Sequence, residues 1–182
     1  MSLLPLPTVK EFLQIMHNKE DIVLQIMLDA IEEWVAAQCA LKFNTGSTVS
    51  NITEDVDGGS LNLRPDMHPI LGVTKILDRD ASDVEVDTTF WRNNNTRVWF
   101  TDGSIWGIGV ERFRMTYTAG YTEDTLPNGL KLAILQLMHR SYNKRGGVSS
   151  DSVAGYGESW DEFFSSDDVK MLRAFSFRQV FA

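Results

Sequence analysis

The apolar residues at the start of the chain recur at helical spacing. From residue 22 to residue 35 they fall three or four positions apart, which places them on one face of an amphipathic helix. These apolar positions are Ile22, Val23, Ile26, Met27, Ala30, Ile31, Trp34 and Val35. The acids of the same segment predict a solvated opposite face, formed by Glu20, Asp21, Asp29, Glu32 and Glu33. The pattern predicts a helix that runs to about Leu41.

A shorter helix is predicted before this one. The run from Thr8 to Glu11 matches a capping box, in which the Thr hydroxyl and the Glu carboxylate satisfy free backbone N–H groups at a helix start. This helix is expected to end near His17. Asn18 is suited to cap the helix that follows.

The periodicity changes to alternation after Asn44, where Thr, Ser, Gly, Asp and Val dominate. Asp102-Gly103 between two apolar runs predicts a β-hairpin over Val98–Trp106. Two prolines, at positions 65 and 69, bracket a turn before a strand expected at Leu71–Leu77. The middle of the chain is therefore predicted to be rich in β-structure.

Strict alternation between residues 112 and 117 predicts a further strand with one apolar and one basic face. Its apolar side carries Phe113, Met115 and Tyr117, and its other side carries Arg112, Arg114 and Thr116.

Helical spacing returns after Pro127, a residue that suits the first turn of a helix because its missing N–H has no partner there. One stripe of this helix contains Leu130, Ala133, Ile134, Leu137 and Met138. Leu132 and Leu135 lie off the stripe, which predicts a helix covered on several sides. Ser166 to Asp168 begin a last short helix, expected to reach about Ala174.

These elements predict an α+β protein, mainly an α-helical bundle of about four helices with a β-rich hairpin insert between the second and third helices. The 182-residue chain suits a single domain. Within it we expect a helical pair at 1–43, the β-rich insert at 44–119, the long helix at 120–145, a flexible linker at 146–165, and a C-terminal helix with a docking tail at 166–182.

Charge and cysteine content narrow the class of protein. A formal net charge of -8 argues against wrapping nucleic acid, because that mode requires a basic surface that neutralises phosphates. The single cysteine, Cys39, excludes an internal disulfide and is expected to pack on a helix as a small apolar residue. The sequence has neither a signal-peptide pattern nor an apolar run of membrane-spanning length, so no membrane partner is expected.

No catalytic, cofactor-binding or metal-binding motif is complete. His17, His68 and His139 have no triad spacing, and structural or surface roles are expected for them. Asp55 to Gly58 begins like a calcium loop, but Arg64 falls where a bidentate Glu belongs, so a turn is expected instead. Gly107-Ile108-Gly109 begins a dinucleotide fingerprint that lacks its third glycine, and it is interpreted as an ordinary strand. We expect no enzyme, no cofactor and no metal.

Aromatic residues exceed what one small core requires. Trp91, Trp99, Phe100 and Trp106 crowd the β-rich segment. Residues 169–182 at the C-terminus combine Phe side chains with positive charge and no acid, on a chain that is otherwise acidic, which favours head-to-tail assembly into a ring. The candidate docking residues are Trp160, Arg173, Phe175, Phe177, Arg178 and Phe181. The alternative is that these aromatics complete the core of the same chain.

The whole pattern resembles the head–tail connector (adaptor) proteins of long-tailed bacteriophages. The helix pair in "PTVKEFLQIMHNKEDIVLQIMLDAIEEWVAAQC" begins the similarity, and "RPDMHPILGVTKILDRD" continues it. The most specific part is "MTYTAGYTEDTLPNGLKLAILQLMHRSYNKR", where Tyr-x-Ala-Gly-Tyr precedes a helix opened by Pro. The closing "DDVKMLRAFSFRQVFA" looks like the final short helix and basic tail of that family.

This resemblance implies a structural subunit of the virion neck, at the head–tail junction, that is made in the host cytoplasm during assembly. About a dozen copies would form a ring beneath the portal protein, extend its channel and present a surface to stopper and tail completion proteins. DNA would pass through without specific binding. A monomer in solution is compatible with this role, because the portal would template the ring.

Two other classes stay open on the sequence alone. One is a small hydrolase whose Asp and His residues converge only in the folded chain, and the other is a soluble protein-binding regulator that uses the aromatic tail. A concave pocket joining His68 or His139 to carboxylates would favour the enzyme. Flat apolar edges would favour the ring subunit.

Overall fold

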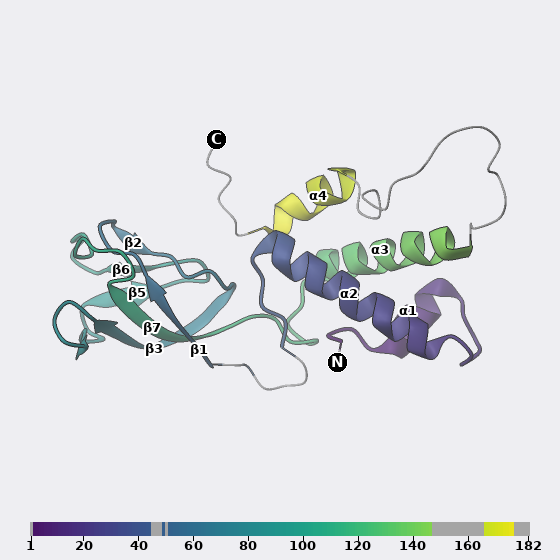
Figure 1. Ribbon diagram of the computed structural model, residues 1–182, viewed down its shortest axis with the longest axis horizontal. Coiled ribbons are helices and arrows are strands. Elements are labelled where there is room, and N and C mark those ends of the chain that lie inside the picture. Colours follow the sequence, from purple (N-terminus) through teal and green to yellow (C-terminus); the bar gives the residue numbers. More distant parts are fainter. Residues whose placement is uncertain (1, 45–48, 50, 147–165, 177–182) are drawn as a thin grey trace. The chain divides into compact units, whose positions relative to one another are not determined.

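The chain folds as two compact units, seen in a computed structural model that describes residues 2–44, 49, 51–146 and 166–176 (Figure 1). The helical unit comprises Met1–Cys39 and Glu123–Ala182. The β unit comprises Ala40–Thr122, inserted between the two parts of the helical unit. The linker expected at 146–165 falls almost entirely outside the described residues.

The helical unit contains α1 (Leu6–Leu13), α2 (Asp21–Cys39), α3 (Asn128–Gly146) and α4 (Ser166–Leu172), followed by a 3-10 turn at Arg173–Phe175. The expected capping box is wrong, because α1 begins earlier: Pro5 is its N-cap residue and makes no side-chain cap, while Thr8 lies inside the helix. The helix also ends at Leu13 and not near His17. The next residue, Gln14, has left-handed backbone angles and donates its N–H to the Glu11 carbonyl.

The inward face of α2 is not the face that the spacing predicted. Its buried apolar residues are Leu24, Leu28, Ile31, Val35 and Cys39. Of the predicted set, only Ile31 and Val35 belong to this face, whereas Ile22 is 79% exposed and Ile26 is 62% exposed. Both sides of α2 are apolar, so periodicity alone could not decide which side enters the core.

Glu32 is a second correction on α2, because it is buried and not solvated. Its two carboxylate oxygens accept the backbone N–H groups of Leu3 at 2.6 Å and Leu4 at 2.8 Å. Burial raises the pKa of this carboxyl, while the two backbone hydrogen bonds oppose the rise. Leu3 and Leu4 are themselves buried. Glu32 therefore fixes the start of the chain against α2.

The predicted stripe on α3 is confirmed. Leu130, Ala133, Ile134, Leu137 and Met138 are all buried. The helix begins directly after Pro127, whose carbonyl accepts the N–H groups of Leu130 and Lys131. The expectation of cover on further sides is wrong at Leu132, which is 48% exposed.

The last helix closes the helical unit by packing on α2 and α3. Leu172 is buried, and the Cys39 thiol, also buried as predicted, lies 3.7 Å from the Leu172 carbonyl oxygen. Asp168 is buried and pairs with Arg140 of α3. Residues distant in sequence are thus joined at the C-terminal helix.

The β unit contains two antiparallel sheets. One has the strand order β1 (Asn51–Val56), β7 (Phe113–Ala119), β3 (Ile70–Asp78) and β4 (Val84–Glu85). The other has the order β2 (Asn62–Leu63), β6 (Val98–Phe100) and β5 (Trp91–Asn93). In Figure 1, β7 runs between β1 and β3. Its alternation is confirmed, since Phe113, Met115, Tyr117 and Ala119 are buried.

Three of the four aromatic residues that crowd the β-rich segment, Trp91, Phe100 and Trp106, belong to a core shared by the two sheets, whereas Trp99 is half-buried and does not belong to it. Trp91 and Trp106 are buried in one cluster with side chains of β3 and β7. The Trp106 ring stacks on Phe100, with ring centroids 3.9 Å apart, and meets Phe113 edge-on at 5.1 Å. These aromatic side chains are therefore engaged within the β unit itself.

Other expectations for the β unit are partly confirmed and partly wrong. The strand predicted after the proline turn is confirmed as β3. The predicted hairpin at Val98–Trp106 is wrong. Asp102-Gly103 does form a turn after β6, but residues 104–109 form no strand, so Gly107 to Gly109 is not one either. The chain is α+β with four helices, as expected, but the β part is a body of two sheets and not a hairpin insert in a mainly helical bundle.

Two leucines of α3 provide a matched test of this packing. Leu137→Ala removes a buried side chain and is expected to lower the free energy of unfolding by about 2 to 5 kcal/mol. Leu132→Ala, on the exposed side of the same helix, is expected to change it by less than about 0.5 kcal/mol. Urea unfolding followed by circular dichroism measures both. Equal losses in the two variants would contradict the assigned faces.

Candidate functional site

The segment from Ile105 to Val110, named here the apolar loop, presents hydrophobic side chains to solvent. Ile105 is 61% exposed, Ile108 is 84% exposed and Val110 is 85% exposed. Between them Trp106 is fully buried in the core of the β unit. The loop is therefore anchored at one point while three large apolar side chains point away from the core.

Close backbone contacts hold the apolar loop against the end of β1. The N–H of Gly58 donates to the Gly109 carbonyl at 2.8 Å, and the N–H of Gly59 donates to the Trp106 carbonyl at 2.9 Å. A Cβ atom at position 58 would lie 1.8 Å from the Gly107 carbonyl oxygen, so only glycine allows this approach. The two glycine-containing segments support each other, although they lie far apart in the sequence.

Arg112 fixes the other side of the apolar loop. Its Nε and Nη2 atoms donate to the two carboxylate oxygens of Asp78 at 2.9 and 2.7 Å. Its Nη1 atom donates to the Ile108 carbonyl at 3.1 Å. A Cβ atom at Gly107 would lie 2.6 Å from the guanidinium carbon, so the glycine makes room for this side chain. The hydrogen bonds from Arg112 lower the pKa of the Asp78 carboxyl.

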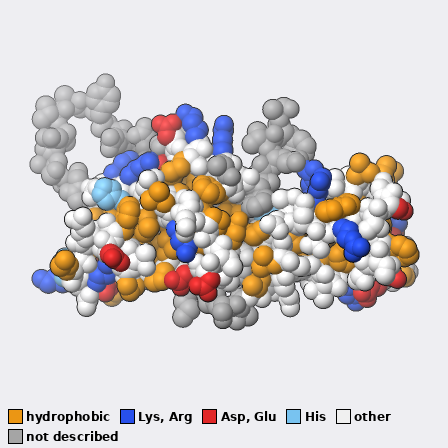
Figure 2. Space-filling view, turned by 180° about the vertical axis from the view of Figure 1, so that it is seen from behind, with side chains coloured by type: hydrophobic (Ala, Val, Ile, Leu, Met, Phe, Trp, Pro, Cys, Tyr) orange, Lys and Arg blue, Asp and Glu red, His pale blue; other side chains and the backbone are white. Residues whose placement is uncertain are grey.

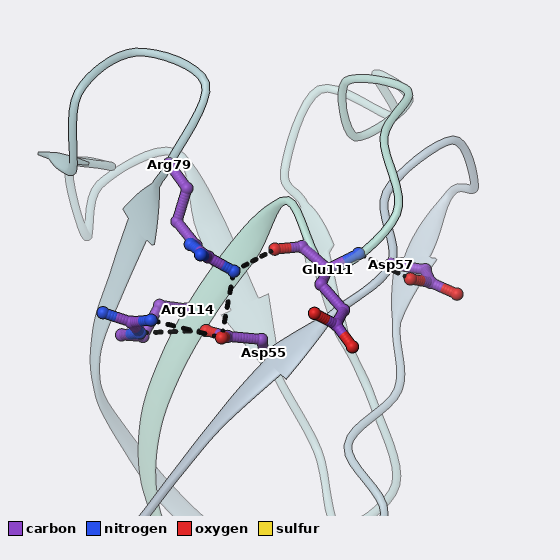
Figure 3. Close-up of polar contacts among 5 residues, drawn as sticks. All are labelled: Asp55, Asp57, Arg79, Glu111 and Arg114. Carbon is purple, nitrogen blue, oxygen red and sulfur yellow. Dashed lines mark hydrogen bonds and ion pairs between the residues drawn. The ribbon is translucent and has the colours of Figure 1, made fainter.

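A second cluster of charges holds the end of the loop (Figure 3). Asp55 of β1 accepts hydrogen bonds from Arg114 Nε at 2.9 Å and from Arg79 Nη1 at 3.0 Å. The same Arg79 atom donates to the Glu111 carbonyl at 3.1 Å, and Asp57 accepts the Glu111 N–H at 2.7 Å. Glu111 has a positive φ of 48°, a conformation that these two contacts support.

These contacts hold the backbone of the apolar loop and its flanking residues while its hydrophobic side chains stay exposed. A loop that is already ordered loses little conformational entropy when a partner binds. Exposed branched apolar side chains gain from burial and offer no group for acid, base or nucleophilic chemistry. The arrangement is suited to protein contact.

A second exposed apolar surface lies on α2, on the side opposite its buried face. This outward stripe contains Ile22, Val23, Ile26, Ala30 and Ala37, all exposed, with Glu33 as its one acid. Met27 and Trp34 border it and are half-buried. Figure 2 shows hydrophobic side chains at the surface of both units.

The predicted docking residues are only partly described. Arg173 is exposed, whereas Phe175 is half-buried and lies against α3, where a Cβ atom at Gly129 would be 2.8 Å from its ring. Trp160, Phe177, Arg178 and Phe181 lie outside the described residues. The structure therefore places Phe175 within the helical unit and leaves the other tail positions as predictions.

The histidines do not come together as a catalytic group. His68 is buried in the β unit with its Nδ1 atom 3.2 Å from the Asn95 carbonyl, and burial lowers the pKa of its imidazole. His17 is exposed, and the exposed His139 contacts Phe12 edge-on in the helical unit. Each of the three has a separate environment.

Across the described ranges, no group of three or more His, Cys, Asp or Glu side chains is arranged to hold a metal ion. Asp55 and Asp57, considered above as parts of a calcium loop, are instead engaged with arginines and a backbone N–H. None of the helices in the described part of the chain has the length and apolar character to cross a membrane.

The sequence patterns do not predict the apolar loop, because each motif by itself indicates a different local structure. Gly107-Ile108-Gly109 favours a strand, and Asp55 to Gly58 favours a turn. The informative signal is the combination of two glycine pairs, Gly58-Gly59 and Gly107 with Gly109, with arginines at the alternating positions 112 and 114. Residues 58 and 107 are adjacent only in the folded chain.

Chains of solved gene transfer agent particles, which are phage-like, have a fold similar to that of this chain. No protein-family model matches the sequence, and no curated protein matches it. Among solved structures, a chain of the neck of an empty gene transfer agent (GTA) particle computed with C6 symmetry aligns with a TM-score of 0.60 and 17% identity, over 98% of this chain and 91% of that chain. The similarity extends across both units.

Two further structures agree. A chain from the virion of a native gene transfer agent particle aligns with a TM-score of 0.63 and 15% identity. A chain from the neck of a native GTA particle computed with C12 symmetry aligns with a TM-score of 0.60 and 16% identity. Each alignment covers 98% of this chain and 91% of the other. At these identities the similarity establishes a shared fold.

The charge cluster around Asp55 predicts a pH-dependent contribution to stability. Hydrogen bonds from Arg114, with the charge of Arg79, lower the pKa of the Asp55 carboxyl. A lowered pKa means that the ionised carboxylate stabilises the folded chain above the ordinary Asp pKa, near about 4, and that this stability is lost as pH falls through the lowered value. Asp55→Asn should therefore be less stable than the parent at pH 7.

Urea unfolding at neutral pH and in steps below about pH 4 measures the difference between Asp55→Asn and the parent. We expect the difference to shrink as the pH falls. Asp124→Asn, which changes an exposed acid of the helical unit, is the matched control. An Asp55→Asn variant as stable as the parent at neutral pH would show that the cluster does not support the fold.

Proposed function

We propose that this protein is a structural head–tail connector (adaptor) subunit of a phage-like particle. In this proposal, copies of the chain form a ring beneath the portal, extend the channel for DNA and provide the docking surface for stopper and tail completion proteins. The protein acts in the virion neck, after synthesis in the host cytoplasm, and it performs no catalysis.

The observation that carries the proposal is the fold similarity over almost the entire chain. Three chains from gene transfer agent particles, two of them from necks computed with C6 or C12 symmetry, cover 98% of this chain at TM-scores of 0.60 to 0.63. A match of this extent includes both units and their order in the sequence. The C6 and C12 symmetry of those necks supports an assembly of repeated copies. The exposed apolar surfaces of both units are suited to contacts in such an assembly.

Overall charge supports the same role. The chain has a formal net charge of -8. An acidic channel wall does not neutralise phosphates, so DNA would slide past it without being held. The charged clusters that the structure describes are internally paired, with Arg112 bound to Asp78 and Arg114 bound to Asp55.

The tail is proposed as the contact with the portal or with an adjacent subunit. Its candidate docking residues are Arg173, Phe175, Phe177, Arg178 and Phe181, and Trp160 of the preceding linker is proposed to join them. Aromatic and Arg side chains are the types that dominate binding energy at interfaces. Because Phe175 packs against α3, we assign the docking role chiefly to the residues after Ser176.

Electron microscopy of the full-length protein mixed with its cognate portal tests the proposed function. We expect a ring of about a dozen copies on one face of the portal. A monomer in the absence of portal agrees with templated assembly. Failure to bind the portal would overturn the proposal, as would reproducible hydrolysis of esters, phosphoesters or nucleic acid by the purified protein.

Removal of residues 177–182 tests the docking tail. We expect the shortened protein to melt close to the parent temperature and to lose co-sedimentation with the portal. Phe175→Ala is the matched control, and it should lower the melting temperature because it removes a ring that packs on α3. A shortened protein that still binds the portal like the parent would contradict the assignment.

A further inference from the structure

We propose that the apolar loop of one copy docks on the outward stripe of α2 in the next copy. This contact rests on the proposed ring, and it specifies which two surfaces join neighbouring subunits. The loop contributes Ile105, Ile108 and Val110, and the stripe is centred on Ile26 and Ala30. In this proposal, each of the two surfaces is occupied by another copy of this chain.

The outward stripe has the composition of a buried helix face. From Ile22 to Ala37 it extends about 22 Å along the helix, at 1.5 Å per residue. Its exposed positions are apolar except for Glu33. A helix on the surface of a monomer normally carries polar residues on this side. Ala30 and Ala37 are small, so the backbone of a partner can approach α2 closely.

The apolar loop is built for insertion. Arg112 and Gly58 bond to its backbone, and Asp57 bonds to the backbone of the next residue, Glu111. The large side chains of the loop are nevertheless exposed and hydrophobic. A projecting contact gains from such support, because preorganisation reduces the entropy lost on binding.

Two different apolar surfaces on one chain are what a ring requires. A ring closes through heterologous contacts, in which one surface of each copy meets a different surface of its neighbour. An isologous contact of stripe with stripe would stop at a dimer. The solved necks with this fold were computed with C6 and C12 symmetry, which heterologous contacts generate. The loop and the stripe lie in separate units of the chain and supply the two surfaces.

Cysteine cross-linking on the assembled ring tests the contact. The native Cys39 is buried, so thiol reagents will report only on introduced cysteines. The double variant Ile26→Cys/Ile108→Cys is assembled on the cognate portal and treated with a short bismaleimide. We expect a ladder of covalent oligomers extending beyond the dimer. An equal mixture of the two single variants should give dimers, and neither single variant alone should give them.

A control pair defines specificity. Ile26→Cys combined with Thr88→Cys, an exposed position outside the apolar loop, should give no ladder. Ile108→Asp should reduce the ring particles seen by electron microscopy at least tenfold, with a melting temperature close to the parent, because the side chain is exposed. Gly107→Ala retains all three apolar side chains but displaces Arg112, and it should also reduce ring formation.

The outcomes separate this inference from the proposed function. Rings that form on the portal without a ladder would overturn the loop-to-stripe contact and leave the connector role standing. A dimer from Ile26→Cys alone would indicate stripe-to-stripe pairing, and a cross-link from Ile26→Cys to the portal would assign the stripe to that protein. Either result overturns the inference. Absence of any ring on the portal would overturn both proposals.

Discussion

The ion pair between Arg112 and Asp78 is the contact on which the end of the β unit that carries the apolar loop depends. It joins the start of β7 to the end of β3 and, through Ile108, reaches the apolar loop. The space for the guanidinium exists because residue 107 is glycine. One side chain thus connects the central sheet to the surface that we propose as a subunit contact, so the position of the loop follows the position of the sheet.

Each of the two units buries apolar side chains in a hydrophobic core of its own. The β unit fills its core with Trp106, Phe100 and Phe113 between two small sheets. The helical unit buries one face of α2 and of α3 and closes with the C-terminal helix. The buried face of α2 does not include its outward side, and this outward stripe is the surface for which we propose a contact with another copy.

The polar contacts described above hold segments of the chain in place. Glu32 holds the first residues of the chain, Asp55 gathers two arginines, and His68 is buried against a backbone carbonyl. Each of these ionisable groups is engaged in joining distant parts of its own unit. Groups engaged in this way are poor candidates for catalysis, which agrees with the structural role that we propose.

The amino-acid sequence predicts four helices, the position of the β segment, the alternation along β7 and the buried stripe of α3, because local periodicity and proline placement decide these features. It does not predict which side of α2 faces inward, since Leu24 and Ile26 are both apolar. Nor could it pair Gly58 with Gly107 or Arg112 with Asp78. Those contacts join residues far apart in the chain, and only the packing of β1, β3 and β7 brings them together.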